Sequence, residues 1–540
     1  MKYTVGVDFG TLSARAVVIC VENGEVLSEG EHRYALWENR LPAGTAVPPD
    51  MVLADPREYQ AALIGSVRKA VAASGAAAED VIGIAVDATS LTLVATDESG
   101  EAMCLKPEWS QDPNAWIKLW KSHSAQKQAE RIEAAAREKR HPLLAQCGGR
   151  ISCEWAYPKM LETYEQSPEL FHKTGRFWDL CDWLTFLLCG EVTRNAGSWC
   201  YKFHFDGKSL PDENFWDQVR TGFGTGLQGK LEGRVILWGE QAGRLLPSMA
   251  EKMGLLPGIA VGGGSLDGHV AMAALGLQHS GDAMLTIGTS TVCGVLAERM
   301  KPVRGVCGAG IDAMIPGKCG YDSGQCSVGD TFQWFVENLT PETYFRLARE
   351  RGISVYDHLS QLAFAHPPRL KDPLALDWWN GNRCTRGDLQ LRGAVQGLSL
   401  STRTEDLYRA LAESTAFGIR NIIENFAKQG VPVSRVRVCG GIARKDPALM
   451  QCYADVLEMP MEVSSRSNVA AVGAAILASV AAGCYPSLQE AMNAQTEKRF
   501  AVYQPRREYS AVYSARYQAY QEMDHFFGGD IPRDSYKQQQ

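Results

Sequence analysis

Short apolar runs alternate along this chain with longer segments whose apolar residues recur at helical spacing. The run Tyr3–Phe9 has the length and composition of a strand. A helix is expected to begin at Asp55-Pro56, where proline suits a first turn, and to end before Gly75. Its apolar residues recur at every fourth position: Tyr59, Leu63, Val67 and Val71.

The alternation continues into the C-terminal part of the chain. Further strands are expected at 16–21, 81–87, 282–287, 292–296 and 435–439. Further helices are expected to start at Ser167-Pro168 and Pro447, to cover 181–188, and to follow one apolar stripe from Leu407 to near Gly430. Strands and helices in alternation indicate an α/β fold.

Two Gly-Thr turns, far apart in the sequence, each lie between two of the expected strands. The first is Asp8-Phe9-Gly10-Thr11 and the second is Gly288-Thr289-Ser290-Thr291. Glycine lets the backbone approach a bound phosphate, and hydroxyl and N–H groups can then donate to its oxygens. The pair therefore suggests a nucleotide held between two lobes.

A third turn, 262–267, contains three glycines and ends on Asp267 at the expected start of a helix. A carboxylate in this position can orient an acceptor hydroxyl and take its proton, so a phosphotransferase is the leading hypothesis. The alternative is that Asp267 only caps the helix, since aspartate is a common N-cap residue.

The length of 540 residues is too great for a single core and indicates two large domains. We place their boundary in 276–281, which gives domains 1–276 and 277–540. The segments 36–50 and 206–239 resemble insertions or surface excursions, and the polar tail 530–540 is expected to fray.

Composition excludes several classes of function. The net charge of -7 and the lack of a long basic run disfavour nucleic acid as a partner. Fifteen cysteines are dilute in this length and form no C-x-x-C pair, so we expect free thiols in a reducing cytosol.

The chain opens directly into a strand without a signal-peptide core. Its most apolar helical run, 469–482, is shorter than the ~20 residues that span a bilayer. A cytoplasmic protein without a membrane partner is expected.

The run 5–15 resembles the opening of the FGGY family of carbohydrate kinases, and its Thr-Leu-Ser step is similar to the ribulokinase branch of that family. The resemblance extends to about residue 520. It rests on the joint order of motifs at 114–121, 148–152, 193–195 with 201–202, 262–267, 288–291 and 320–325.

The resemblance implies two α/β domains of the actin-like, ribonuclease-H-like ATPase type, with ligands in a cleft between them. The N-terminal domain would bind sugar and carry the catalytic aspartate, and the C-terminal domain would bind ATP. The implied reaction transfers the ATP γ-phosphoryl to the terminal hydroxyl of a ketopentose, foremost L-ribulose to L-ribulose 5-phosphate in arabinose catabolism. Kinases for D-ribulose, xylulose or a polyol remain alternatives, as does an actin-like ATPase without kinase activity.

The same resemblance assigns roles to individual residues. Asp267 would be the catalytic base, and Asp8 and Asp267 would serve Mg²⁺, although Asp8 could instead be an ordinary turn residue. The residues expected at ATP are Gly10, Thr11, Ser13, Arg15, Gly288, Thr289, Ser290, Gln325, Gly440, Gly441, Lys445 and Asp446.

The resemblance places five residues at the sugar: Ser90, Trp120, Lys202, Asp267 and Asp322. Trp120 could instead belong to a core, Lys202 could lie on the surface, and Asp446 could cap a helix.

The chain departs from the family pattern at three positions. Ala88 replaces the usual Phe, Asp322 replaces Glu, and Asp446 replaces Asn. The first two shorten side chains near the expected pocket, so the preferred ketose could differ. Homodimers and closure of the lobes on sugar are further expectations.

Overall fold

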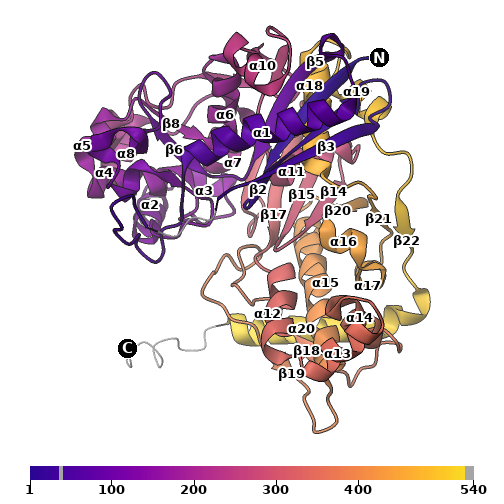
Figure 1. The fold of residues 1–540 in the computed structure, drawn as a ribbon. Coiled ribbons are helices and arrows are strands. Elements are labelled where there is room, and N and C mark those ends of the chain that lie inside the picture. Colours follow the sequence, from indigo (N-terminus) through magenta and orange to yellow (C-terminus); the bar gives the residue numbers. More distant parts are fainter. Residues whose placement is uncertain (36–39, 530–540) are drawn as a thin grey trace.

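The computed structural model describes residues 1–35 and 40–529 and forms two lobes, each built around a central β-sheet (Figure 1). The α/β class and the two-lobed organisation are thereby confirmed. The expectation of a fraying tail at 530–540, and part of the expected excursion at 36–50, lie outside the described residues.

The N-terminal sheet has the strand order β11-β12-β5-β1-β2-β3, with β13 paired to β5. Its strands are β1 Tyr3–Phe9, β2 Ser13–Cys20, β3 Val26–Arg33, β5 Val81–Ala88, β11 Gln241–Arg244, β12 Ala260–Gly262 and β13 Ser265–Leu266. Apolar residues of α1 Pro56–Ser74, α6 Leu180–Cys189 and α10 Pro247–Met253 form one core with β1 and β5. Because β1 and β5 are buried along almost their whole length, most of their side chains are apolar on both faces of the sheet, with Asp8 and Asp87 as exceptions near the strand ends.

A smaller layer extends the N-terminal lobe. Its four-stranded sheet has the order β4-β7-β6-β8, with β4 Leu53–Ala54, β6 Leu93–Thr96, β7 Ile117–Lys118 and β8 Arg176–Asp179. Its helices are α2 Gln126–Glu138, α3 Leu143–Gln146, α4 Ala156–Gln166, α5 Pro168–Lys173, α7 Ala196–Lys202, α8 Glu213–Val219 and α9 Phe223–Gly226. The short strands β9 Thr193–Asn195 and β10 Arg234–Ile236 pair with each other.

The C-terminal sheet has the strand order β16-β17-β15-β14-β20-β21-β22. Its strands are β14 Asp282–Ile287, β15 Thr291–Ala297, β16 Gly308–Ile311, β17 Cys319–Gln325, β20 Arg435–Cys439, β21 Met461–Val463 and β22 Ala501–Tyr503. The pair β18 Leu374–Ala375 and β19 Val395–Gln396 lies apart from this sheet.

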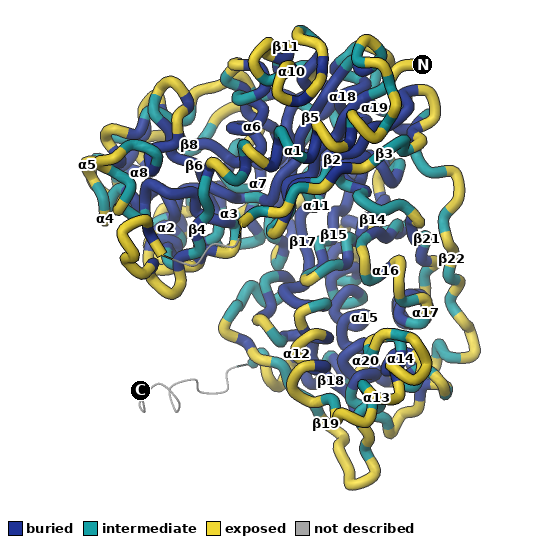
Figure 2. The backbone as a smooth tube through the Cα atoms, viewed as in Figure 1, coloured by how far each residue is buried: buried dark blue, intermediate teal, exposed yellow. Residues whose placement is uncertain are grey.

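Helices surround the C-terminal sheet and fill its lobe. They are α12 Gly329–Leu339, α13 Glu342–Glu350, α14 Val355–Ala363, α15 Thr404–Lys428, α16 Gly441–Lys445, α17 Pro447–Leu457 and α20 Ser510–Gly528. The helix α19 Leu488–Gln495 packs instead on α18 Val469–Ala481 (Figure 1). In Figure 2 the buried stretches follow α15 and the central strands, which places the core of this lobe between them.

Two helices, α11 Asp267–Ala274 and α18 Val469–Ala481, join the lobes. Their side chains form one buried cluster that also includes Val17 of the N-terminal sheet and Met284 of the C-terminal sheet. The packing is close enough to require glycine, since a Cβ at Gly6 would lie 1.8 Å from the carbonyl oxygen of Ala471. The boundary at 276–281 stays a prediction, because α18, far beyond it in sequence, packs on β1 and β5.

Several predicted elements match the observed bounds, namely Tyr3–Phe9, Asp282–Ile287 and Arg435–Cys439. The expected insertion or surface excursion at 206–239 has many exposed residues, but it also contributes to a core. Phe215, Trp216 and Phe223 are buried in the core of the smaller layer, where charged neighbours in sequence had obscured their role.

The fifteen cysteines are free thiols, and all but Cys307 and Cys484 are buried. Among the described residues, no helix combines the length and the apolar character that crossing a membrane requires.

Replacing Gly6 by valine is expected to destabilise the protein, because the new side chain would push α18 away from β1. Overpacking of this kind costs about 1–3 kcal/mol. Urea unfolding followed by circular dichroism should show a lower midpoint than the wild type. Gly441→Ala is the control, since a Cβ there meets no atom within 4 Å. An unchanged midpoint for Gly6→Val would contradict the packing described.

Candidate active site

Three aspartates gather where neighbouring strands of the N-terminal sheet end. Asp8 on β1 lies directly beside Asp87 on β5 in the parallel register. Ser265 of β13 is also paired with Asp87. Asp267 directly follows β13 and begins α11, so it lies at the same edge of the sheet. Carboxyl ends of parallel strands meet at one edge of a sheet, which is where α/β proteins place ligands. Sequence analysis missed Asp87, although it is the last residue of an expected strand.

Burial and mutual repulsion dominate the electrostatics of this cluster. Burial, followed by the charge of Asp8, raises the pKa of Asp267 to about 7. Burial and the charges of Asp8 and Asp267 hold the pKa of Asp87 well above its usual value. The pKa of Asp8 is also raised by burial, although the hydrogen bond with Asp87 and the charge of Arg15 oppose that rise. If all three groups were ionised, the buried cluster would carry more negative charge than its protein neighbours balance, which is why the three pKa values are raised.

Asp87 is the least satisfied member of the cluster. It is fully buried, and neither carboxylate oxygen accepts a hydrogen bond from a protein donor. The proton implied between Asp8 and Asp87 is the one partner they can share. The Arg15 guanidinium lies 3.9 Å from the Asp8 carboxylate. A buried carboxylate without donors fits a position beside a cation.

The first Gly-Thr turn, expected at a phosphate, is closed by a hydrogen bond from the Gly10 N–H to the Ser13 carbonyl, at 3.1 Å. Thr11 is half-buried in this turn. The Ser13 hydroxyl donates to Glu31 of β3 at 2.8 Å, which ties the turn to the neighbouring strand. Arg15 lies between Glu31, at 3.4 Å, and Asp8.

The second Gly-Thr turn, 288–291, lies beside the segment 440–446, which is also expected at ATP. The Gly288 N–H donates to the Ser290 carbonyl at 2.9 Å, and the N–H of Val328 donates to the Thr289 carbonyl at 2.8 Å. Gly440 approaches the end of β14 so closely that a Cβ would lie 2.1 Å from the Ile287 carbonyl oxygen, and its φ of +109° also favours glycine.

Gly441 and Lys445 follow on the exposed side of α16. The structure therefore brings 288–290 and 440–445 together.

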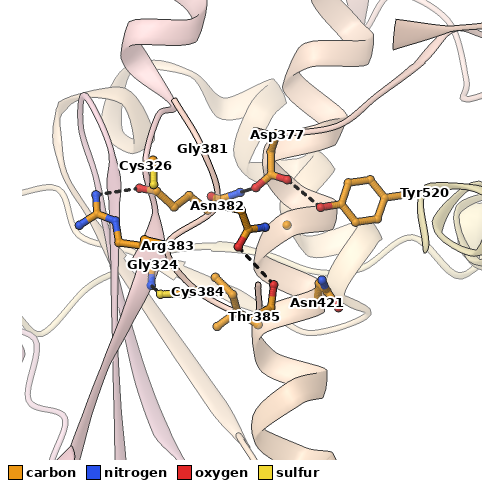
Figure 3. A pocket seen from close by; sticks show the side chains of 13 residues that line it. Gly324, Cys326, Asp377, Gly381, Asn382, Arg383, Cys384, Thr385, Asn421 and Tyr520 are labelled. Carbon is orange, nitrogen blue, oxygen red and sulfur yellow. Dashed lines mark hydrogen bonds between the residues drawn. The ribbon is translucent and has the colours of Figure 1, made fainter. Parts of the chain in front are cut away.

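Two residues expected at ATP have side chains engaged elsewhere. The Gln325 amide donates to Asp377 at 2.7 Å and to the Thr415 carbonyl at 2.9 Å, inside the C-terminal lobe. Figure 3 shows the small polar pocket there, with Tyr520 bonded to Asp377 and Arg383 pointing to the opposite side.

The Asp446 carboxylate caps α17 by accepting from the Leu449 N–H at 2.9 Å, and it also accepts from Ser360 at 2.9 Å. These contacts match the alternative interpretation of Asp446 as a helix cap.

Charged side chains from the two lobes meet at the expected sugar site. Asp322 of β17 lies 3.4 Å from the Lys202 ammonium and 3.2 Å from Nε2 of His269. Burial alone would raise the pKa of Asp322, but the charges of Lys202 and His269 hold it well below its usual value. Lys202 is therefore not a surface residue, since its side chain is only 11% exposed. His269, two positions after Asp267, was missed by sequence analysis.

Ser90 and Trp120 lie in the N-terminal lobe. The Ser90 hydroxyl donates to Asp179 at 2.8 Å, and the half-buried Trp120 has an indole N–H without a protein acceptor. Asp267 is close enough to feel the charges of Asp179 and Lys202, which connects it to this part of the site.

Two further details concern the edge of this region. Sequence analysis missed Glu154, which accepts from His123 at 3.0 Å and interacts with the charges of Arg383 and Lys202. Ala88 is fully buried in the core cluster that contains Phe9, so it is part of that core.

The chain is similar to known proteins along almost its whole length. The model of the FGGY family of carbohydrate kinases matches residues 3–276 with its N-terminal domain and 283–482 with its C-terminal domain. A ribulokinase of Halalkalibacterium halodurans is 37% identical over 535 residues, which cover 98% of this chain and 95% of the relative. A ribulokinase of Mycolicibacterium smegmatis is 38% identical over 540 residues, with the same coverage.

Among solved structures, the xylulose kinase from Rhodospirillum rubrum has a TM-score of 0.79 and 18% sequence identity, covering 97% of this chain and 99% of that one. At this identity the match supports the fold alone.

Asp87→Asn is expected to stabilise the unliganded protein at pH 8 and to lose that advantage toward pH 5. The folded state raises the pKa of Asp87, so its carboxylate costs stability increasingly as pH rises above the unfolded value. The gain at pH 8 should be at least about 1 kcal/mol, since one pKa unit corresponds to about 1.4 kcal/mol. Thermal unfolding at both pH values measures it.

The exposed Glu138→Gln is the matched control and should show no such dependence on pH, because its side chain is 74% exposed. A destabilised Asp87→Asn at pH 8 would contradict the electrostatics described.

Proposed function

Because the chain belongs to the FGGY family of carbohydrate kinases, we propose that it phosphorylates the terminal hydroxyl of L-ribulose with ATP to give L-ribulose 5-phosphate. The enzyme is a phosphotransferase that uses a sugar and ATP. Nearly full-length similarity to several ribulokinases supports this choice of ketose and a role in arabinose catabolism. Family membership rules out the alternative of an actin-like ATPase without kinase activity.

The observation that carries the mechanism is the position of Asp267 between two groups of residues. On one side it feels the charge of Asp8, next to the first phosphate turn, and on the other it feels Asp179 and Lys202, near the sugar site. A base must reach both the acceptor hydroxyl and the site of transfer. With its pKa raised to about 7, Asp267 is a stronger base than an ordinary aspartate and is partly ionised at neutral pH.

The chain's own residues would align donor and acceptor, since phosphoryl transfer depends mainly on positioning and charge balance. The turns at Gly10-Thr11 and Gly288-Thr289-Ser290 would hold the phosphates with backbone N–H and hydroxyl groups. The backbone of Gly440-Gly441 and the ammonium of Lys445 would lie against the nucleoside. In this proposal Arg15 holds Asp8 in place, whereas Gln325 and Asp446 support the fold of the nucleotide lobe.

The sugar would lie among Ser90, Trp120, Lys202 and Asp322. Asp322 remains ionised and keeps acceptor capacity for hydroxyl groups, and the free indole N–H of Trp120 can donate to one. The Lys202 ammonium can donate to another while it pairs with Asp322.

The carboxylates fit Mg²⁺, which prefers oxygen ligands and is usually held by one or two carboxylates, waters and phosphate oxygens. Asp8 and Asp267 would serve it, and the donor-free oxygens of Asp87 add a third negative group. Within 1–35 and 40–529, no three acidic, histidine or cysteine side chains could hold an ion by themselves. When bound, Mg²⁺ would neutralise charge on the phosphates.

A homodimer and a cytoplasmic location remain predictions of the sequence. The ketose also has alternatives, since kinases for D-ribulose or xylulose would share the same phosphate-binding residues. Asp322, which is shorter than the usual Glu, lies at the expected sugar site and could change which ketose is preferred.

A panel of ketoses and polyols, assayed by coupled ADP detection, tests the substrate. L-Ribulose is expected to give the highest kcat/KM, ahead of D-ribulose, xylulose and the polyols. A tenfold preference for another sugar would replace L-ribulose in the proposal. ADP release that ignores every sugar would overturn the kinase reaction itself.

Asp267→Asn is expected to lower kcat by about 10²–10⁴-fold, the usual contribution of a general base. Affinity for ADP, measured by calorimetry, should change little, because the phosphate turns are intact. Asp322→Asn is the comparison variant and should mainly raise the KM for sugar. Near-normal turnover by Asp267→Asn would remove Asp267 from the catalytic role.

A further inference from the structure

Lys159 of α4 is a fully buried lysine outside the residues assigned so far. Its ammonium donates to the Leu91 carbonyl at 2.9 Å and to the Leu119 carbonyl at 2.8 Å. Leu91 follows Ser90, and Leu119 precedes Trp120. One side chain therefore ties together the two segments that carry the expected walls of the sugar site.

No carboxylate among the described residues forms an ion pair with Lys159 within 4.0 Å. The acidic groups that it feels, Glu154 and Asp179, act from farther away, and burial lowers its pKa to about 7. Holding an ammonium in the interior without an adjacent counter-ion is costly. The contacts that offset this cost are the two carbonyl groups.

A neighbouring lysine shows the contrast. Lys118 of β7 is equally buried, but it pairs with Glu162 at 2.7 Å and also bonds Asn114 at 2.7 Å. The contact with Glu162, together with a hydrogen bond from the Lys118 ammonium to the main-chain carbonyl of Lys159 at 3.3 Å, fastens β7 to α4, and none of these contacts involves Ser90 or Trp120. Lys118 thus has the ordinary contacts of a buried structural ion pair, and Lys159 does not.

Both segments held by Lys159 have polar groups available for a ligand. Ser90 is half-buried and bonded to Asp179, whose other contacts fix the start of α6. The buried indole nitrogen of Trp120 has no protein acceptor. A small change in the separation of these segments would misplace both groups relative to one sugar.

We propose that Lys159 is a positioning residue that sets the spacing of the Ser90 and Trp120 segments and thereby the fit of the sugar. It touches no reacting atom, so it acts on sugar binding rather than on phosphoryl transfer. The proposal rests on the proposed function in requiring a sugar at Ser90 and Trp120, but it does not depend on which ketose is preferred.

The test compares Lys159→Met, which has similar length but no donor, with Lys159→Gln, which keeps two N–H donors without the charge. Lys230→Met is the matched control. Lys230 is also buried and donates to two main-chain carbonyls, those of His172 and Thr174, away from the sugar segments. Wild-type activity on the ketose panel is measured first, and its best sugar is used for every variant.

Lys159→Met should raise the KM for sugar at least about tenfold, while the KM for ATP and kcat stay within about threefold of the wild type. The KM for sugar of Lys159→Gln should lie between those of the wild type and Lys159→Met. Lys230→Met should lower the unfolding temperature about as much as Lys159→Met does, but it should leave the KM for sugar unchanged.

Equal rises in both KM values, or an unchanged KM for sugar, would overturn the proposal. So would unfolding of both Lys159 variants while Lys230→Met remains folded, because Lys159 would then serve the fold. A wild type that phosphorylates D-ribulose or xylulose instead would correct the proposed substrate and leave this test intact.

Discussion

The crowding of three carboxyl groups at the ends of adjacent strands is the constraint on which the rest of the site depends. Asp8 and Asp87 lie side by side in the register of β1 and β5, and Asp267 begins the helix that follows β13. Folding removes these groups from water, and the positive groups that act on them are Arg15 beside Asp8 and Lys202, whose charge reaches Asp267. The protein alone leaves the cluster unbalanced, and an incoming cation with its phosphates can balance it. The same imbalance makes Asp267 a better base.

Close packing between the lobes keeps this cluster in place. The helices α11 and α18 lie in one buried cluster with residues of both sheets, and glycine at position 6 allows α18 to approach β1. Asp322 from the C-terminal lobe then meets Lys202 and His269 from the N-terminal lobe. Asp267 and His269, which contacts Asp322, therefore share the helix α11. In the proposed mechanism this shared helix would couple acceptor binding to the position of the base.

Local sequence patterns predicted much of the fold, because the buried strands are continuous apolar runs. Each Gly-Thr turn connects an antiparallel pair, β1 with β2 or β14 with β15. These patterns could not supply register, and register is what brings Asp87 beside Asp8. Motif order could not supply side-chain direction either. Gln325 and Asp446 lie in the expected motifs, but their side chains bond within the C-terminal lobe. Buried Trp216 was hidden by a charged neighbourhood in sequence, since burial there depends on contacts with distant residues.

The titration of aspartate carboxyl groups tests the central claim most directly. Protein with ¹³C-labelled aspartate can be followed by NMR without ligands, in the wild type and in Asp267→Asn. The wild type should show a carboxyl signal that titrates near pH 7 and is missing from the variant. If the signal that disappears in Asp267→Asn titrates below about 5 in the wild type, close to the value of an exposed carboxyl, the crowding described here does not exist.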